Sequence, residues 1–239
     1  MRTLELILTL VLFLPMVACD KHATAKKEIQ SSWEAYRAAS ENGDGAAAAE
    51  LLSKPSLDRY TRLLKLALDA PAAECWKLSP SDMGEVAAMR TTYSRKDLKG
   101  LDGAGYTVKS IKEGHWFTYG PEWKLRSIRV SQSGDAATAV LCDPEAESDF
   151  RAKKFVGAFS RTARRINRTM ESPPTFAAAF VKDGDLWKFD ETAMLPDLDK
   201  EILQGAKDEQ VSVRDFIALQ TSQQDDPKQA LKIWEPMKK

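Results

Sequence analysis

A glutamate and a histidine two residues apart are the side chains whose types and spacing best suit proton transfer. Glu113 follows Tyr106–Lys112 and His115 begins His115–Tyr119, two stretches rich in strand-forming residues. Residues two apart in a strand share a face, so the pair could act as acid and base, or bind a metal with a third ligand. The alternative, which we favour, is a turn at Glu113–Gly114 with the histidine at a strand edge.

Other catalytic motifs are absent from the sequence. It contains no HExxH motif, no glycine-rich phosphate loop and no nucleophile elbow. His22, the only other histidine, precedes the first expected helix. Asp183 and Asp185 flank a glycine, which favours a hairpin turn over a calcium loop because two acids are too few ligands. We therefore expect no metal and no cofactor, and we place a non-enzymatic role ahead of an enzymatic one.

A run of basic residues without any acid is the second candidate site. Between Phe150 and Met170 the lysines and arginines are Arg151, Lys153, Lys154, Arg161, Arg164, Arg165 and Arg168. On a helix, Phe155, Phe159 and Ile166 gather opposite most of these bases. The segment is therefore expected to form an amphipathic basic helix.

Three interpretations of this basic helix stay open. It could pack its apolar side on a sheet and leave the bases in water, which is the commonest use of such a pattern. It could rest on anionic lipid headgroups, where each base near the surface adds about 1 kcal/mol. It could also dock an acidic envelope protein. The whole chain has 35 basic and 35 acidic residues, so its global charge gives no reason to expect nucleic acid.

Helical periodicity dominates the first half and the C-terminal part of the chain. Apolar residues such as Trp33 and Tyr36 recur at spacings of three and four, and serine caps or prolines mark several starts. The expected helices cover Ala25–Asn42, Ala46–Leu52, Leu57–Leu68, Ser79–Arg90, Ser94–Gly100 and Ser212–Gln220, with a last one starting at Asp226–Pro227.

The middle of the chain has the two-residue period and the turn residues of antiparallel strands. Besides the two stretches around Glu113, the expected strands are Trp123–Ser131, Ala136–Cys142, Thr175–Lys182 and Leu186–Glu191. Asp183-Gly184-Asp185 joins the last two as a tight hairpin. The sequence thus predicts an α+β fold: N-terminal helices packed against a curved, mainly antiparallel sheet, with a helical insert and a C-terminal helical appendage.

The first twenty residues indicate export. A basic Arg2 precedes an apolar run, Leu6–Val17, that is long enough for a signal peptide but too short to span a bilayer. Ala18-Cys19 then resembles the lipobox of bacterial lipoproteins, which implies that Cys19 is acylated and becomes the mature N-terminus. Asp20 resembles the residue that retains lipoproteins in the inner membrane, with the outer membrane as the alternative. We expect a periplasmic protein attached to the bilayer through acylated Cys19, since two acyl chains hold a protein stably.

Two cysteines remain after the proposed anchor. Cys75 and Cys142 would lie in an oxidising compartment, where a pair is most simply a disulfide. Closing so long a loop would contribute about 4 kcal/mol in the chain-entropy model. The alternative is two buried free thiols.

Two segments resemble the nuclear-transport-factor-like superfamily of cone-shaped α+β domains. They are Trp33-Glu-Ala-Tyr-Arg-Ala-Ala-Ser-Glu-Asn-Gly-Asp44, within the first expected helix, and Asp183-Gly-Asp-Leu-Trp-Lys-Phe-Asp190, in the last hairpin. The resemblance implies a curved sheet wrapped around a long N-terminal helix over residues 25–195. That superfamily includes isomerases with an acid in an apolar cone, although no position here matches a catalytic acid.

These observations divide the chain into a signal peptide (1–18), a lipidated tether (19–24), the cone-like domain (25–195) and the C-terminal appendage (196–239). The expected function is a membrane-anchored periplasmic lipoprotein that binds a ligand or another protein of the cell envelope. The alternative is a small-molecule enzyme of the isomerase or hydrolase type that uses Glu113 and His115 in the cone. An open cone would favour the enzyme, whereas a cone filled by Trp33, Tyr36 and Phe176 would favour the interaction module.

Overall fold

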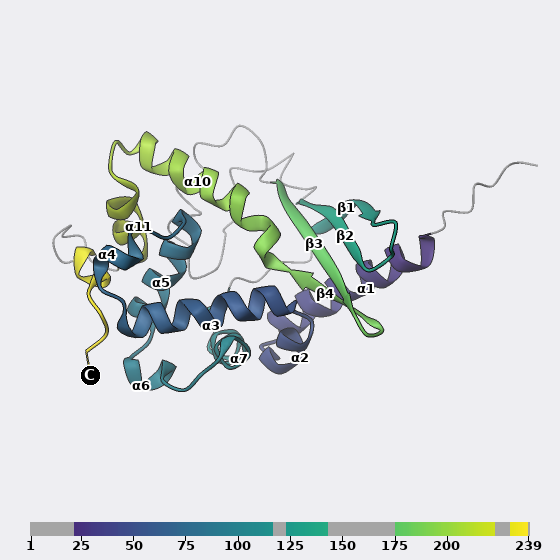
Figure 1. Cartoon of the computed structure of the whole chain (residues 1–239), viewed down its shortest axis with the longest axis horizontal. Helices are drawn as coiled ribbons and strands as arrows, with labels where there is room; N and C mark the ends of the chain where they lie inside the picture. Colours follow the sequence, from purple (N-terminus) through teal and green to yellow (C-terminus); the bar gives the residue numbers. More distant parts are fainter. Residues whose placement is uncertain (1–21, 117–122, 143–174, 223–229, 239) are drawn as a thin grey trace, which may run out of the picture.

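The structure is a computed structural model that describes residues 22–116, 123–142, 175–222 and 230–238 (Figure 1). Within these ranges helices pack against a four-stranded antiparallel sheet, so the predicted α+β class is confirmed. Figure 1 shows an elongated molecule, with the sheet and helix α1 at one end and a group of helices at the other. The long helix α3 (Lys54–Asp69) runs between the two ends.

Before the sheet, the described helices are α1 (Ala23–Glu41), α2 (Gly45–Glu50), α3, α4 (Ala72–Cys75), α5 (Pro80–Thr92), α6 (Arg95–Leu98) and α7 (Gly103–Lys112). Side-chain caps begin several of them. Ser53, Ser79 and Ser94 each accept a hydrogen bond from the backbone N–H three residues on, which satisfies a donor that the helix leaves unpaired. The caps at Ser79 and Ser94 are the predicted starts of α5 and α6, whereas α3 begins three residues before the predicted Leu57 because Ser53 caps it.

The prediction of a strand at Tyr106–Lys112 is wrong, because these residues form most of α7. Asp102 caps the helix by accepting from the N–H of Gly105. The helix also packs closely on its neighbours: a Cβ on Gly103 would lie only 1.9 Å from the carbonyl oxygen of Leu57 in α3. Tertiary packing and a local cap thus override the strand preference of its aromatic and β-branched residues.

The sheet has the order β1-β2-β3-β4, with every neighbouring pair antiparallel. Its strands are β1 (Lys124–Val130), β2 (Ala136–Cys142), β3 (Thr175–Asp183) and β4 (Leu186–Asp190), each within a residue or two of the prediction. The outer edge of β4 is covered by the loop between α2 and α3. Phe189 donates to Leu51 O at 2.8 Å, and Ser53 donates to Phe189 O at 2.8 Å.

After the sheet, the described elements are η1 (Glu191–Met194), α10 (Leu195–Asp208), α11 (Val213–Thr221) and η2 (Leu231–Trp234). Helix α11 follows the cap predicted at Ser212, which accepts from the N–H of Asp215. Helices α10 and α11 pack on α5, and Ile202, Phe216 and Trp234 belong to the same hydrophobic core as the sheet. The described part of residues 196–239 is therefore mainly helical and packs back on the first half of the chain.

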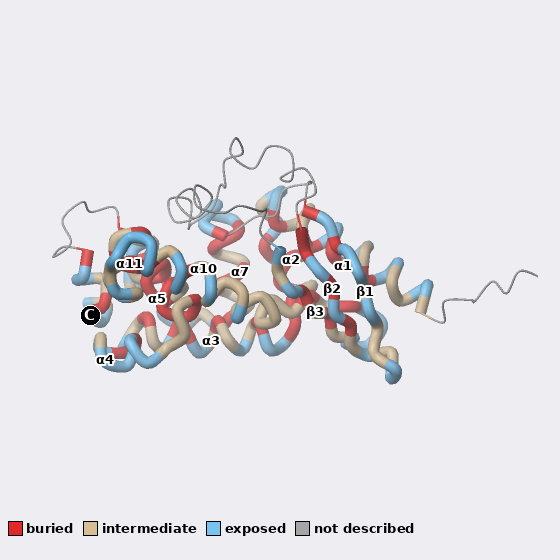
Figure 2. The backbone as a smooth tube through the Cα atoms, turned by 90° about the horizontal axis from the view of Figure 1, so that it is seen from above, coloured by how far each residue is buried: buried red, intermediate tan, exposed pale blue. Residues whose placement is uncertain are grey.

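The core between α1 and the sheet is filled by aromatic side chains. Trp33 and Tyr36 of α1 are 1% and 0% exposed, and Phe180 and Phe189 of the sheet are both 0% exposed. The ring of Phe189 lies 5.2 Å from that of Trp33 and 5.3 Å from that of Tyr36. Figure 2 shows buried residues where α1 lies against the strands. Burial of large aromatic surfaces holds this layer together.

An arginine joins the end of α3 to α5 and to the C-terminal segment. Arg90 donates to the carbonyl oxygens of Leu66 (2.9 Å), Ala67 (2.8 Å) and Ala70 (2.7 Å) at the C-terminal end of α3. It also donates to Ile233 O at 3.2 Å. A helix leaves its last carbonyls unpaired, so one guanidinium satisfies several of them at once. We call this group the arginine joint.

Candidate functional site

Glu113 and His115 lie on the surface at the end of α7 and not on a strand. Glu113 is the residue that follows the helix, Gly114 has a φ of +71°, and His115 donates its backbone N–H to Ser110 O at 2.8 Å. The expected strand face that would bring the two side chains together is therefore wrong. The turn at Glu113–Gly114, one part of our favoured alternative, is present, but His115 follows a helix and does not lie at a strand edge.

Both side chains of this pair have partners on the surface. Glu113 is bound to Lys109 at 2.7 Å, one turn back along α7. The ring of His115 stands edge-on to Tyr93, with the ring centroids 5.6 Å apart. Neither side chain points into the interior, since both residues are exposed. The pair does not line a cavity where it could act as acid and base.

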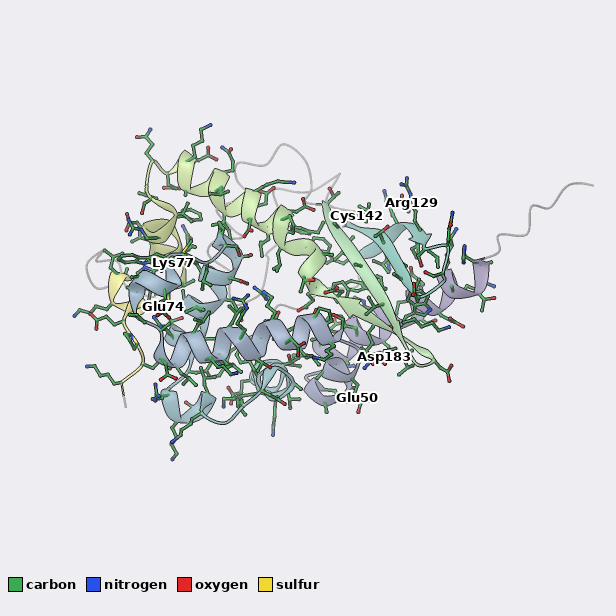
Figure 3. The ribbon with its side chains drawn as sticks, viewed as in Figure 1. Glu50, Glu74, Lys77, Arg129, Cys142 and Asp183 are labelled. Carbon is green, nitrogen blue, oxygen red and sulfur yellow. The ribbon has the colours of Figure 1, made fainter. Side chains whose placement is uncertain are left out.

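In the structure the two cysteines are free and buried, which corresponds to the second of the two alternatives, buried free thiols. Cys75 ends α4 in the helical end of the molecule, whereas Cys142 ends β2 at the sheet, where its thiol donates weakly to Lys124 O at 3.8 Å. Figure 3 shows Glu74, the neighbour of Cys75, among the helices and Cys142 at the sheet, well apart in this view. Burial raises the pKa of the Cys75 thiol, and the adjacent Arg90 opposes that shift. The thiol is therefore less reactive than an exposed cysteine.

Two groups of predicted site residues lie outside the described residues. One is the anchor, Cys19 with Asp20. The other is the basic run Arg151, Lys153, Lys154, Arg161, Arg164, Arg165 and Arg168.

A carboxylate held by two tyrosines is the polar centre of the interior. Glu191, the first residue of η1, accepts from the phenol of Tyr36 at 2.7 Å through Oε1 and from that of Tyr60 at 2.8 Å through Oε2. Trp116 donates its indole N–H to the Tyr36 hydroxyl at 3.1 Å. The residues come from α1, α3, η1 and the segment after α7. We call them the tyrosine–carboxylate cluster.

Local backbone contacts hold Glu191 in place. Its N–H donates to the hydroxyl of Ser56 at 2.9 Å, and that hydroxyl donates to Asp190 Oδ1 at 3.2 Å. Burial raises the pKa of Glu191 above its ordinary value, against the hydrogen bonds from Tyr36 and Tyr60 and the charge of Arg59, which lower it. Both carboxylate oxygens thus have donors, and the group is bound on both sides.

An ion-pair network adjoins the cluster across α3 and α5. Arg59 binds Asp82 at 2.7 Å, with 9% and 10% of the two side chains exposed, and Arg62 binds the other oxygen of Asp82 at 2.5 Å. The guanidinium of Arg59 also lies 5.2 Å from the centre of the Tyr60 ring. Breaking such a buried pair leaves an uncompensated charge, so these residues fix how α3 and α5 pack.

The chemistry of the tyrosine–carboxylate cluster is that of a closed hydrogen-bond network. Each carboxylate oxygen of Glu191 accepts a phenol, and Tyr36 in turn accepts the indole of Trp116. Proton transfer to a substrate would require one of these bonds to be replaced. The cluster therefore ties four segments together, as satisfied buried polar networks do.

The tyrosine–carboxylate cluster was not predicted from the sequence, although two of its residues carried a signal. Tyr36 and Tyr60 fall at core positions of two amphipathic helices, and a buried tyrosine hydroxyl usually has a hydrogen-bond partner. The acid beyond the last strand, Glu191, was assigned only as the end of that strand. The two tyrosines lie 155 and 131 residues before it, so no local pattern connects them.

Large apolar side chains are exposed at both ends of the molecule. At the helical end, Trp76 is 43% exposed and the Arg214 guanidinium lies 4.4 Å from the centre of its ring. At the sheet end, Leu186 in the β3–β4 hairpin is 56% exposed. Within the described residues, no three histidine, cysteine or acidic side chains are grouped to hold a metal ion. No helix in the same ranges is long and apolar enough to cross a membrane.

Comparisons with protein-family models, curated proteins and solved structures give no match for this chain.

Proposed function

We propose that the protein is a lipid-anchored binding or interaction module of the cell envelope, periplasmic and held by acylated Cys19. The anchor rests on the lipobox-like residues before Cys19. Asp20 favours the inner membrane, with the outer membrane as the alternative. The proposal has two parts, attachment to a bilayer and binding of another molecule, and each part has its own test.

The observation that carries the binding role is the filled interior between α1 and the sheet. Trp33, Tyr36, Phe180 and Phe189 are each at most 1% exposed, and their rings pack on one another. A small-molecule site would need an apolar cavity with a few convergent polar groups. Because the aromatic side chains occupy this space, we expect recognition to use the outer surface of the domain.

One exposed surface and one sequence segment outside the described residues support an interaction role. The first is Trp76 stacked with Arg214, since tryptophan and arginine are the residue types that contribute most to protein interfaces. The second is the basic run from Arg151 to Arg168, for which anionic lipid or an acidic envelope protein is the proposed partner. The enzymatic alternative loses its candidate residues, because Glu113 and His115 are exposed and bound to surface neighbours.

Metabolic labelling with a palmitate analogue tests the anchor. The wild-type chain should incorporate the label and fractionate with membranes, and Cys19→Ser should abolish both. A membrane fraction that Cys19→Ser leaves unchanged contradicts the anchor.

Site-specific photo-crosslinking in native membranes tests the binding role. A crosslinking residue in place of the exposed Trp76 should give a discrete protein adduct. The matched control is Glu50, which is exposed on α2. Equal labelling at both positions contradicts an interaction surface at Trp76. A small molecule retained by the purified protein in native mass spectrometry contradicts the argument from the filled interior.

A further inference from the structure

We propose that one end of the molecule lies against the lipid surface, with Leu186 at the tip of the β3–β4 hairpin in contact with it. This end, which we call the hairpin end, consists of the first turns of α1, the β1–β2 turn and the β3–β4 hairpin. The inference rests on the lipid anchor of the proposed function and adds which face of the domain meets the bilayer.

The length of the tether is the first argument. Cys19 precedes the first residue of α1, Ala23, by four residues. An extended chain spans at most about 3.5 Å per residue, so the start of α1 lies within about 14 Å of the acylated cysteine. Helix α1 itself has 19 residues and is about 28 Å long. The tether therefore keeps the start of α1 near the lipid surface and leaves the far end of the molecule beyond that reach.

Direct contacts connect the start of α1 to the β3–β4 hairpin. Trp187, the residue after Leu186, donates its indole N–H to Glu28 Oε2 in the second turn of α1 at 3.1 Å. The hydroxyl of Ser32, one turn further along, donates to Trp187 O. Figure 1 shows the start of α1 and the tips of both hairpins at the same end of the molecule. A lipid surface close to Ala23 is therefore also close to the hairpin.

The chemistry of the hairpin tip suits the interfacial region of a bilayer. Leu186 is 56% exposed, more than Trp76, Val140, Leu203 or Leu231, which are the other exposed large apolar side chains among the described residues. Lys182 lies over the Trp187 ring, with its nitrogen 6.0 Å from the ring centre. Long basic side chains beside an apolar contact extend their charges to the water.

The charged residues of the β3–β4 hairpin balance one another, so its contact with lipid is not an electrostatic one. Lys182 and Lys188 are matched by Asp183 and Asp185, and Lys188 is bound to Asp183 at 2.7 Å. Two bases and two acids give no net attraction to anionic headgroups. The contact therefore depends on Leu186 and on the tether, and we expect it to be insensitive to salt, unlike a polybasic contact.

Fluorescence quenching by headgroup-spin-labelled lipid tests the orientation in the lipidated full-length protein on phosphatidylcholine vesicles. A fluorophore is attached at Leu186→Cys, at Arg129→Cys near the β1–β2 turn, or at Lys77→Cys. Figure 3 shows Arg129 at the sheet end and Lys77 at the opposite end. Because Cys75 and Cys142 are buried, an introduced surface cysteine reacts selectively in the native state.

Quenching should be severalfold stronger at positions 186 and 129 than at position 77, both at low salt and at high salt. Equal quenching at the three positions, or stronger quenching at position 77, overturns the orientation. Inserting a Gly/Ser spacer of about 20 residues after Asp20 adds a reach of about 25 Å and should reduce the difference between the two ends. An unchanged difference overturns the role of the tether.

These results separate the orientation from the anchor. If Cys19→Ser leaves the vesicle-bound fraction unchanged, the proposed lipid anchor has failed. If binding requires Cys19 but position 77 is quenched as strongly as position 186, only the inference about the hairpin end has failed.

Discussion

Replacing Tyr60 with phenylalanine tests whether phenol hydrogen bonds stabilise the buried carboxylate of Glu191. The Tyr60 hydroxyl donates to Oε2 at 2.8 Å, and its residue is 6% exposed. Phenylalanine keeps the ring and its packing, so the change removes the hydrogen bond without opening a cavity. Because both carboxylate oxygens accept, the geometry suits the ionised acid, for which a hydrogen bond contributes about 1.5–3 kcal/mol. We predict that Tyr60→Phe lowers the free energy of unfolding by that amount at pH 7.

A double-mutant cycle isolates this pair from other effects. Tyr60→Phe, Glu191→Gln and the double variant are unfolded in urea, with circular dichroism as the probe. If the phenol and the carboxylate interact as described, the double variant loses less stability than the sum of the two single variants, by about 1.5–3 kcal/mol. A coupling energy below about 0.5 kcal/mol, the usual deviation from additivity, refutes the reasoning.

The pH dependence of the unfolding free energy tests the same carboxylate, because the raised pKa predicts the direction of the change. Burial raises the pKa of Glu191 in the folded protein above that of the unfolded chain. Between the two pKa values the native state binds more protons than the unfolded state, so the contribution of Glu191 to stability falls as pH rises through that interval. Relative to Glu191→Gln, the wild type should therefore lose stability as pH rises from about 4.3, the ordinary value for glutamate. The opposite slope contradicts the raised pKa.

The arginine joint, a glycine of α7 and the two thiols give further predictions. Arg90→Ala leaves the carbonyls of Ala67 and Ala70 at the end of α3 without the guanidinium donor, while Leu66 O keeps the N–H of Ala70, and should lower the unfolding free energy in urea by at least about 2 kcal/mol. Arg37→Ala, in an ion pair within α1, should cost less than about 0.5 kcal/mol. Gly103→Ala would place a methyl group 1.9 Å from a backbone carbonyl of α3 and should cost about 3 kcal/mol in the same assay; a neutral result contradicts that close approach. In a chain lacking the tether, a thiol reagent should label neither Cys75 nor Cys142 in the native state and both after denaturation without reductant; failure to label after denaturation would show that they are bridged.

Elements with strong local signals could be predicted from the sequence. Ser79 before Pro80 marks the start of α5, and Asp183-Gly184-Asp185 marks the β3–β4 hairpin, because a cap or a turn is decided by residues a few positions apart. Helix α7 was missed because its residues prefer strands while the reasons for the helix are distant. Gly45 and Gly103 let it approach α2 and α3 at distances that no side chain would permit.

Prediction of the tyrosine–carboxylate cluster was limited in the same way, by contacts between residues far apart in the sequence. The pattern of Tyr36 and Tyr60 predicts that both face the core, and they do. The pattern does not identify their partner, because Glu191 follows β4, more than 130 residues later in the chain. The prediction that Glu113 and His115 share one face of a strand failed for a different reason, an incorrect secondary structure. Their two-residue spacing has meaning only in a strand, and the chain there is the end of a helix.

The arginine joint also has a consequence for how the chain reaches its final structure. Arg90 binds the end of α3, a neighbour in sequence, but its bond to Ile233 spans 143 residues, and Arg95 makes a similar bond to Met237. Contacts between such distant residues slow folding, because the intervening chain must be ordered first. The bonds of Arg90 in α5 and Arg95 in α6 to the C-terminal segment therefore form only after the segment around Ile233 is in place. If the chain crosses a membrane starting from its N-terminus, as proposed, its fold stays incomplete until the segment around Ile233 has also crossed. Until then the unfolded part of the chain remains accessible to the export machinery.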